Sequence, residues 1–207
     1  MNRPSEDRWT CLWKLAGVPS APPDWYTRLD TLYSESHRHY HTWIHIAECL
    51  QEFDAAGNLA VRPVAVELAI WFHDAIYDPR APDNEEKSAE LGTKCLSKTS
   101  LAHDLTNQVA QLILATKHHV ASLDPDAAFL LDVDLSILGQ PESRFLEYEQ
   151  QIREEYAWVP EPTFKSKRAE ILGRFLARER IYVTESFFER YETKARSNLK
   201  RSLHDLR

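Results

Sequence analysis

Residues 63–74 read Pro-Val-Ala-Val-Glu-Leu-Ala-Ile-Trp-Phe-His-Asp. Proline suits the first turn of a helix, and the residues after Pro63 are almost all apolar. A helix that is apolar on nearly every side is buried on most sides. The stretch therefore predicts a central buried helix that ends in an imidazole and a carboxylate, His73 and Asp74.

Prolines divide the rest of the chain into pieces of helical length with apolar residues at helical spacing. No β alternation of useful length and no internal repeat is evident. We expect an all-α protein with a single domain over 1–207, made of about nine helices. The expected helices cover 25–33, 38–56, 63–74, 84–96, 101–117, 125–138, 141–158, 164–179 and 185–203.

The composition excludes several classes of protein. Of 207 residues, 43% are hydrophobic and 28% charged, which is ordinary for a globular protein and unlike disordered or collagenous chains. Only five glycines are present, which argues against phosphate-binding glycine loops. The net charge of -7 gives no electrostatic footprint for duplex nucleic acid.

Targeting signals are also lacking. No apolar stretch approaches the roughly 18 residues of a membrane span, and no signal peptide is evident, so we expect a cytoplasmic protein without a membrane partner. The three cysteines are scattered and form no CxxC pair, so neither a disulfide framework nor a zinc finger is supported.

Histidines gather in three groups, and two aspartates follow them. His41 and His45 are four residues apart and would share a face of the helix expected over 38–56. His73-Asp74 is the second group, and His118-His119 is the third. Asp132 and Asp134 stand in the otherwise apolar run Phe-Leu-Leu-Asp-Val-Asp-Leu-Ser-Ile-Leu. Each group alone has an ordinary structural explanation, such as a hydrogen bond at a helix end.

Buried carboxylates in such runs need a partner, because an isolated buried charge is very costly. A metal ion is the simplest common partner for several imidazoles and aspartates. Imidazole with carboxylate suits Mn, Fe, Co, Ni or Zn, with Mg²⁺ also admitted. Asp132 and Asp134 lie about 200° apart on a helix, so they cannot both face one metal. If one is a ligand, the other aspartate would cap a helix, pair with an arginine or contact a metal ligand from outside.

The order His45, His73-Asp74, Asp134 resembles the H…HD…D signature of the HD-domain superfamily of metal-dependent phosphohydrolases. The resemblance implies an HD-type helical domain, with its core over about 25–140, the helices of 141–207 packed on it, and the metal site buried in the bundle. It also implies that His45, His73, Asp74 and Asp134 bind the metal, with Asp132 as the alternative carboxylate. Several further stretches are similar to an uncharacterised bacterial subgroup of predicted HD-superfamily hydrolases: Asn84-Glu85-x-x-Ser88-Ala89, Ile152-Arg153-Glu154-Glu155-Tyr156 and Ala195-Arg196-Ser197-Asn198-Leu199.

The string Tyr40-His41-x-x-x-His45 is similar, more distantly, to one in cyclic-nucleotide phosphodiesterases. That likeness implies that His41 is the general acid and His45 a metal ligand. Residues 75–78 lack a further histidine of those enzymes, so one metal site is favoured over two.

Other residues are candidates for catalysis or for holding a phosphate. Glu85 at the start of a helix and His119 after a helix end are catalytic candidates, although Glu85 is equally explained as an acidic first-turn residue. Arginine suits phosphate, and the C-terminal quarter is basic. The candidates for substrate binding are Arg38, Lys117, His118, Arg153 and Arg196, with Arg168 beside them. Ordinary surface pairing is the alternative for each.

The sequence therefore predicts an enzyme, a metal-dependent phosphohydrolase (phosphomonoesterase or phosphodiesterase) of a nucleotide or another small phosphorylated molecule. Two alternatives remain open: an HD-fold di-iron oxygenase, and a non-catalytic HD module that binds metal or nucleotide. Six tryptophans would allow an apolar homodimer interface.

Overall fold

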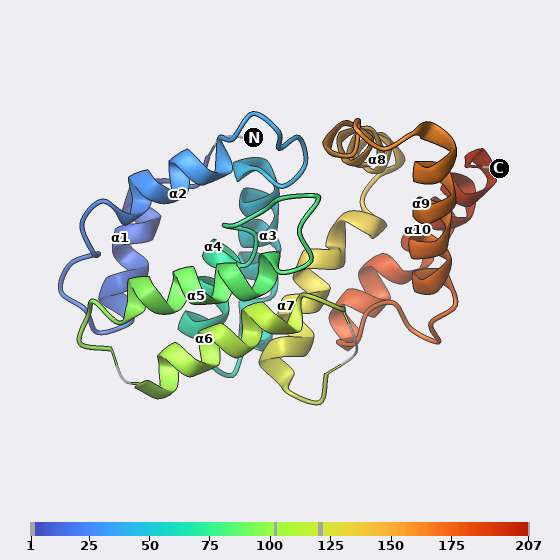
Figure 1. Cartoon of the computed structure of the whole chain (residues 1–207). Coiled ribbons are helices and arrows are strands. Elements are labelled where there is room, and N and C mark those ends of the chain that lie inside the picture. The colour runs from blue at the N-terminus through green and yellow to red at the C-terminus, as the bar shows by residue number, and fades with distance from the viewer. Residues whose placement is uncertain (1–2, 102, 120–121, 207) are drawn as a thin grey trace. The chain divides into compact units, whose positions relative to one another are not determined.

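The computed structural model describes residues 3–101, 103–119 and 122–206, and within these ranges it contains helices and no strand. The all-α prediction is confirmed, with ten α-helices and two 3-10 helices in the described ranges rather than about nine helices (Figure 1). The α-helices are α1 (Glu6–Leu15), α2 (Trp25–Tyr33), α3 (Trp43–Ala56), α4 (Pro63–Phe72), α5 (Asn84–Leu96), α6 (His103–Ala115), α7 (Pro125–Asp134), α8 (Glu142–Glu155), α9 (Glu161–Leu176) and α10 (Glu185–Asp205). The 3-10 helices are η1 (Gly57–Leu59) and η2 (Leu135–Gly139).

The chain divides into two compact units, Met1–Leu131 and Asp132–Arg207. The division falls inside α7, so this helix begins in the first unit and ends in the second. The single HD-type domain over 1–207 remains a prediction, and each unit is described by itself below.

Helix α4 is the centre of the first unit. Every residue from Ala65 to Phe72 is buried, and α1, α3, α5 and α6 all contact this helix. Helices α5 and α6 lie side by side (Figure 1). Gly92 of α5 lies against the Phe72 ring of α4, so the two helices approach closely there. The apolar run of residues 63–72 thus forms the buried helix that the sequence predicted.

Helix α1 was missing from the sequence prediction. Ser5 caps it by accepting a hydrogen bond from the backbone N–H of Arg8, and its apolar face presents Trp9, Leu12 and Trp13 at helical spacing. The Trp9 ring lies 5.1 Å from that of Trp71 in α4, between ring centroids. A capping serine followed by three regularly spaced apolar residues was a sufficient signal for this helix.

Helix α3 begins at Trp43, later than the expected start at residue 38. Thr42 accepts a hydrogen bond from the backbone N–H of Ile44, as an N-cap residue does. His41 therefore precedes the helix, and the idea that His41 and His45 stack on one helical face was wrong. Residues 38–42 form no helix. Contacts such as those of Arg38 with the carbonyl oxygen of His41, and of the His41 ring with Tyr77, hold this segment in place.

Most other helix boundaries differ from the expected ones by a few residues. The largest difference is at the end of α7, which stops at Asp134 and continues as η2 instead of running to residue 138 as an α-helix. Pro162 occupies the first turn of α9, where proline is tolerated.

The second unit is organised around η2 and α10. Asn198 of α10 donates hydrogen bonds to the carbonyl oxygens of Leu138 and Gln140, at 2.9 and 3.0 Å. Tyr182 donates from its hydroxyl to the carbonyl oxygen of Leu135. Side chains near and on α10 therefore satisfy the backbone carbonyls of η2, which a short 3-10 helix leaves open.

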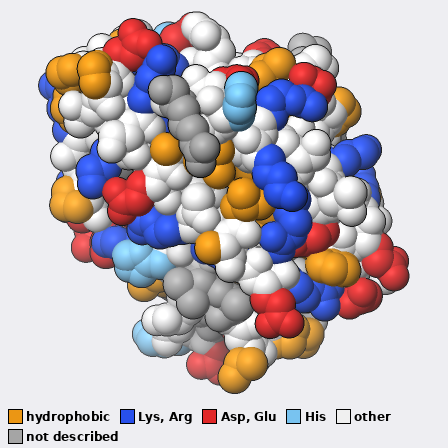
Figure 2. Space-filling model, turned by 90° about the vertical axis from the view of Figure 1, so that its right-hand side faces the viewer, with side chains coloured by type: hydrophobic (Ala, Val, Ile, Leu, Met, Phe, Trp, Pro, Cys, Tyr) orange, Lys and Arg blue, Asp and Glu red, His pale blue; other side chains and the backbone are white. Residues whose placement is uncertain are grey.

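Several basic side chains of residues 165–207 form ion pairs with neighbouring carboxylates. On α9, Lys165 pairs with Glu161, and both Lys167 and Arg174 pair with Glu170. The face in Figure 2 shows Lys and Arg side chains interspersed with Asp and Glu rather than gathered in one patch. Among the described residues, no helix has both the length and the apolar character needed to cross a membrane.

Gly139 of η2 leads to a stability prediction. A Cβ atom added there would lie 2.6 Å from Cβ of Tyr191, which α10 holds in place. We expect Gly139→Ala to lower the free energy of unfolding in a urea titration by about 1–3 kcal/mol, the usual cost of overpacking.

The matched control is Gly173→Ala on α9, where an added Cβ meets nothing within 4 Å. Alanine favours a helix interior over glycine by about 1 kcal/mol, so this variant should be as stable as the wild type or more stable. Equal effects of the two substitutions would contradict the close packing of η2 on α10.

Candidate metal centre

Two helices of the first unit place three potential metal ligands together. His45 lies in the first turn of α3, and His73-Asp74 follows the last residue of α4 directly. Both imidazoles are buried, with 2% of His45 and 1% of His73 exposed. The contact between α3 and α4 therefore brings His45 to the His-Asp pair, although 28 residues separate them in sequence.

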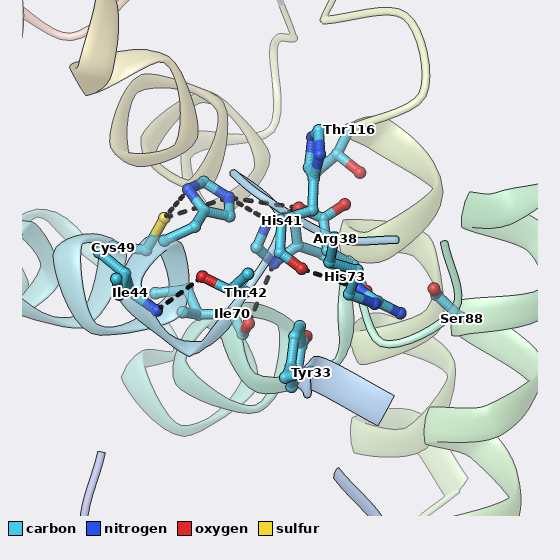
Figure 3. A network of polar contacts seen from close by, with 12 residues as sticks. Tyr33, Arg38, His41, Thr42, Ile44, Cys49, Ile70, His73, Ser88 and Thr116 are labelled. Carbon is cyan, nitrogen blue, oxygen red and sulfur yellow. Dashed lines mark hydrogen bonds and ion pairs between the residues drawn. The ribbon is translucent and has the colours of Figure 1, made fainter. Parts of the chain in front are cut away.

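The three side chains form a nearly equilateral triangle of ligand atoms. His45 Nε2 lies 3.1 Å from His73 Nε2, and Asp74 Oδ2 lies 3.3 Å from the first nitrogen and 3.2 Å from the second. Figure 3 shows this part of the structure, with His41, His73 and Cys49 among its labelled residues.

Hydrogen bonding of His73 fixes which of its nitrogens faces the triangle. Nδ1 lies 3.0 Å from the carbonyl oxygen of Ile70, and because a carbonyl only accepts, Nδ1 carries the hydrogen. In the neutral imidazole Nε2 then presents a lone pair towards Asp74 Oδ2, which is also an acceptor. Two acceptors at this separation need a proton or a cation between them.

A metal ion satisfies the triangle better than a proton. A proton joins two of the three atoms, whereas one cation contacts all three. At a metal–ligand distance of about 2.1 Å, neighbouring ligands lie about 3.0 Å apart around an octahedral ion and about 3.4 Å apart around a tetrahedral one. The observed sides of 3.1–3.3 Å fall between these values, so the spacing of the three atoms matches that of ligands around one divalent ion.

Electrostatics keep the Asp74 carboxylate ionised. Burial alone would raise the pKa of this carboxyl, but the imidazoles of His73, His41 and His45 hold the pKa well below its usual range. An ionised carboxylate and a histidine nitrogen oriented by a backbone carbonyl are the states in which these residues bind metals.

Sequence reasoning missed Cys49. This residue follows His45 by one turn of α3, is 2% exposed, and places Sγ 3.7 Å from Nδ1 and 3.8 Å from Nε2 of His45 (Figure 3). Potential ligand atoms of His45, Cys49 and His73 all lie within 4.8 Å of one another. The signal was the spacing His45-x-x-x-Cys49, which puts both side chains on one helical face. His45, Cys49 and His73 of the first unit thus belong to a group of side chains that could hold a metal ion.

Arg38 is placed to organise the backbone around the site. Its guanidinium is fully buried and donates to the carbonyl oxygens of His41, Asp74 and Ala75, at 3.0, 2.7 and 2.9 Å, while Nε donates to Glu35. Four of the five N–H donors of Arg38 are therefore used within the protein. The expected role in binding substrate phosphate does not follow from this geometry, which instead ties the segment of His41 to the segment of Asp74.

Two residues of α5 hold the loop that follows the His-Asp pair. Ser88 Oγ accepts from the backbone N–H of Ile76 at 3.0 Å. The Asn84 side chain accepts a hydrogen bond from the backbone N–H of Asp78 through Oδ1 and donates one to the Asp78 carbonyl oxygen through Nδ2. The Asn84-Glu85-x-x-Ser88 stretch singled out in the sequence thus fixes the loop after Asp74, and no ligand is needed to explain Asn84 and Ser88.

His41 stands next to the triangle although it is outside α3. Its ring stacks on that of Tyr77 with 4.1 Å between centroids, and it lies 6.0 Å from the His45 ring. Its charge is among those that lower the pKa of Asp74. The side chain is half-buried, so it borders both the cluster and the outside.

The remaining candidates of the first unit lie around the start of α5 and the end of α6. Glu85 is half-buried in the first turn of α5. Lys117 pairs with Glu86 and donates to the carbonyl oxygen of Pro82 at 2.9 Å, so its charge is partly neutralised. His118 is exposed, and His119 is half-buried with a φ of 46°, in the left-handed region.

The arginine candidates of the second unit are engaged with its own backbone and carboxylates. Arg153 donates to the carbonyl oxygens of Tyr156 and Val159 beyond the end of α8. Arg196 pairs with Glu192 and donates to three carbonyl oxygens just beyond and at the end of α9. Arg168 is buried against Glu149 and lies over the Tyr148 ring. These contacts give all three arginines partners within the protein, and their expected roles in binding substrate remain predictions.

Asp132 and Asp134 have different surroundings. Asp132 accepts hydrogen bonds from the N–H of Val183 and from the N–H and hydroxyl of Thr184, at 2.6–2.8 Å, just before α10. It therefore ties the second half of α7 to the start of α10, and capping of a helix was among the roles open to it. Asp134 is the last residue of α7, in the second unit, and its role as a metal ligand remains a prediction.

The chain matches no family model, no curated protein and no solved structure in comparisons with known proteins.

Proposed function

We propose that this protein is a metal-dependent phosphohydrolase that acts on a nucleotide or another small phosphorylated molecule. The observation that carries the proposal is the triangle of His45 Nε2, His73 Nε2 and Asp74 Oδ2, whose sides match the spacing of ligands around one divalent ion. The chemistry of the donor set admits Mn, Fe, Co, Ni or Zn.

The order of the ligands in the sequence supports the choice of reaction. His45, His73-Asp74 and Asp134 follow the pattern of HD-domain phosphohydrolases, and the proposal includes Asp134 as a further ligand. Asp132 is left out of the ligand set, because its two oxygens accept hydrogen bonds at the start of α10.

In the proposed mechanism the ion supplies positive charge, and residues of the chain hold the ion and transfer protons. When bound, a divalent ion supplies positive charge that stabilises phosphoryl oxygens and makes water more acidic. His45, His73 and Asp74 hold it, while Arg38 and Ser88 keep the segments that carry His41 and Asp74 in place. Positioned groups of this kind need no rearrangement during the reaction.

His41 is the proposed general acid. It borders the triangle, is half-buried, and is held against Tyr77, so its imidazolium can donate a proton to the leaving-group oxygen. Glu85 and His119 remain candidates for a second proton-transfer group. Since Arg38, Arg153 and Arg196 donate to the protein itself, the phosphate would be held by the ion, with His118 and Lys117 as the remaining candidates for contact.

Removal of a ligand should abolish both metal binding and hydrolysis. We expect His73→Ala and Asp74→Asn to lose the metal that elemental analysis finds in the wild type. Phosphate release from a panel of nucleotides and sugar phosphates should fall by at least about 100-fold, because even loss of a residue that only hydrogen-bonds to a metal ligand costs up to about that much. His103→Ala is the matched control, because His103 is exposed on α6 and bonds only to Asn107 among the contacts resolved for it.

Three results would contradict the proposed function. Wild-type protein purified without metal, and inactive with every added divalent ion, would exclude a hydrolase of this kind. Nucleotide binding by metal-free protein without turnover would indicate a binding module. Two irons per chain together with oxygen consumption would indicate an oxygenase.

A separate test addresses His41. We expect His41→Ala to keep its metal and to lower kcat by about 10²–10⁴-fold on natural phosphate esters, the range for loss of a general acid. A substrate with a p-nitrophenol leaving group needs little protonation, so its kcat should fall far less. An equal loss on both kinds of substrate would rule out the acid role, and loss of the metal would make His41 a ligand.

A further inference from the structure

We infer that Cys49 is a thiolate ligand of the metal centre, which makes the centre selective for zinc, iron or cobalt over magnesium and manganese. The inference rests on the metal centre of the proposed function and adds the nature of its ion. It does not depend on which phosphate ester is hydrolysed.

The position of Cys49 carries the argument. Its Sγ lies 3.8 Å from Nε2 of His45, and potential ligand atoms of Cys49, His45 and His73 lie within 4.8 Å of one another. A sulfur and a nitrogen bound to one tetrahedral zinc, at 2.3 and 2.0–2.1 Å, are about 3.6 Å apart. The observed separation of Sγ from His45 Nε2 is therefore close to that of two ligands of one ion.

The surroundings of Cys49 differ from those of an ordinary buried thiol. Cys95 is also buried, and burial raises the pKa of its thiol with only the charges of Lys98 and Arg28 to oppose the effect. Cys49 instead contacts an imidazole that faces a second imidazole and a carboxylate. Of the two buried cysteines, Cys49 alone lies in this group of potential ligands.

Binding of the metal by Cys49 exchanges a proton for the metal ion. The S–H bond of Cys49 breaks, its proton passes to solvent, and a sulfur–metal bond forms without oxidation or reduction. Thiolate is a soft ligand that suits zinc, iron and cobalt, whereas magnesium and manganese prefer oxygen ligands. The thiol would thus determine which ion occupies the centre, while the imidazoles and the carboxylate would bind any of them.

Cobalt spectroscopy tests this directly. Metal-free protein is titrated with Co²⁺ in the absence of oxygen, and both the visible d–d bands and the near-ultraviolet sulfur-to-cobalt charge-transfer band are recorded. We expect wild type and the Cys11→Ser/Cys95→Ser variant, in which Cys49 is the sole thiol, to show both sets of bands. We expect Cys49→Ser to keep the d–d bands, to lose the charge-transfer band and to bind Zn²⁺ at least about tenfold more weakly.

The possible results distinguish failure of the thiolate ligand from failure of the metal centre. Visible bands without a charge-transfer band in the wild type, or a charge-transfer band that persists in Cys49→Ser, would overturn the thiolate ligand and leave the metal centre standing. Absence of all cobalt bands would overturn both. Should Cys49→Ser fail to fold, the variant with Cys49 as its sole thiol still decides, because any charge-transfer band in it must arise from Cys49.

Discussion

The candidate metal centre depends on the contact of two buried imidazoles with one carboxylate. His73 donates through Nδ1 to the carbonyl oxygen of Ile70, so its other nitrogen presents a lone pair to Asp74 at 3.2 Å and to His45 at 3.1 Å. Without a proton or a cation between them, the lone pairs of His73 Nε2 and Asp74 Oδ2 would face each other at hydrogen-bond distance, which is unfavourable. The chain surrounds the cluster with structure that fixes it: α4 is buried along its length, and Arg38 ties the neighbouring backbone together.

The apolar run of residues 63–72 made this part of the fold predictable. A helix that buries every side must lie at the centre of its unit, and whatever polar residues follow it must find partners. Both conclusions needed only the sequence, and the structure places His73 and Asp74 as expected, at the end of α4 and beside His45.

Other features were harder to predict, for physical reasons that differ. The start of α3 depends on Thr42 as a cap, a local signal that the histidine spacing obscured. Cys49 was missed because cysteines were judged by pairing with other cysteines, whereas its partner is His45, one helical turn away. The roles of Arg38, Arg153 and Arg196 could not be derived at all, because their carbonyl partners are set by where loops and helix ends fold.

X-ray absorption at the metal edge of zinc-loaded protein measures the central claim most directly. The account predicts a zinc ion with nitrogen and oxygen neighbours at about 2.0–2.2 Å, the distances of zinc–imidazole and zinc–carboxylate bonds, and a sulfur neighbour at about 2.3 Å from Cys49, together with the outer-shell scattering of two imidazoles. The intensity of this imidazole scattering should fall by half in His45→Ala, because one of the two imidazole ligands is then removed. A spectrum of water ligands alone, or one unchanged by that substitution, would contradict a metal centre at His45, His73 and Asp74.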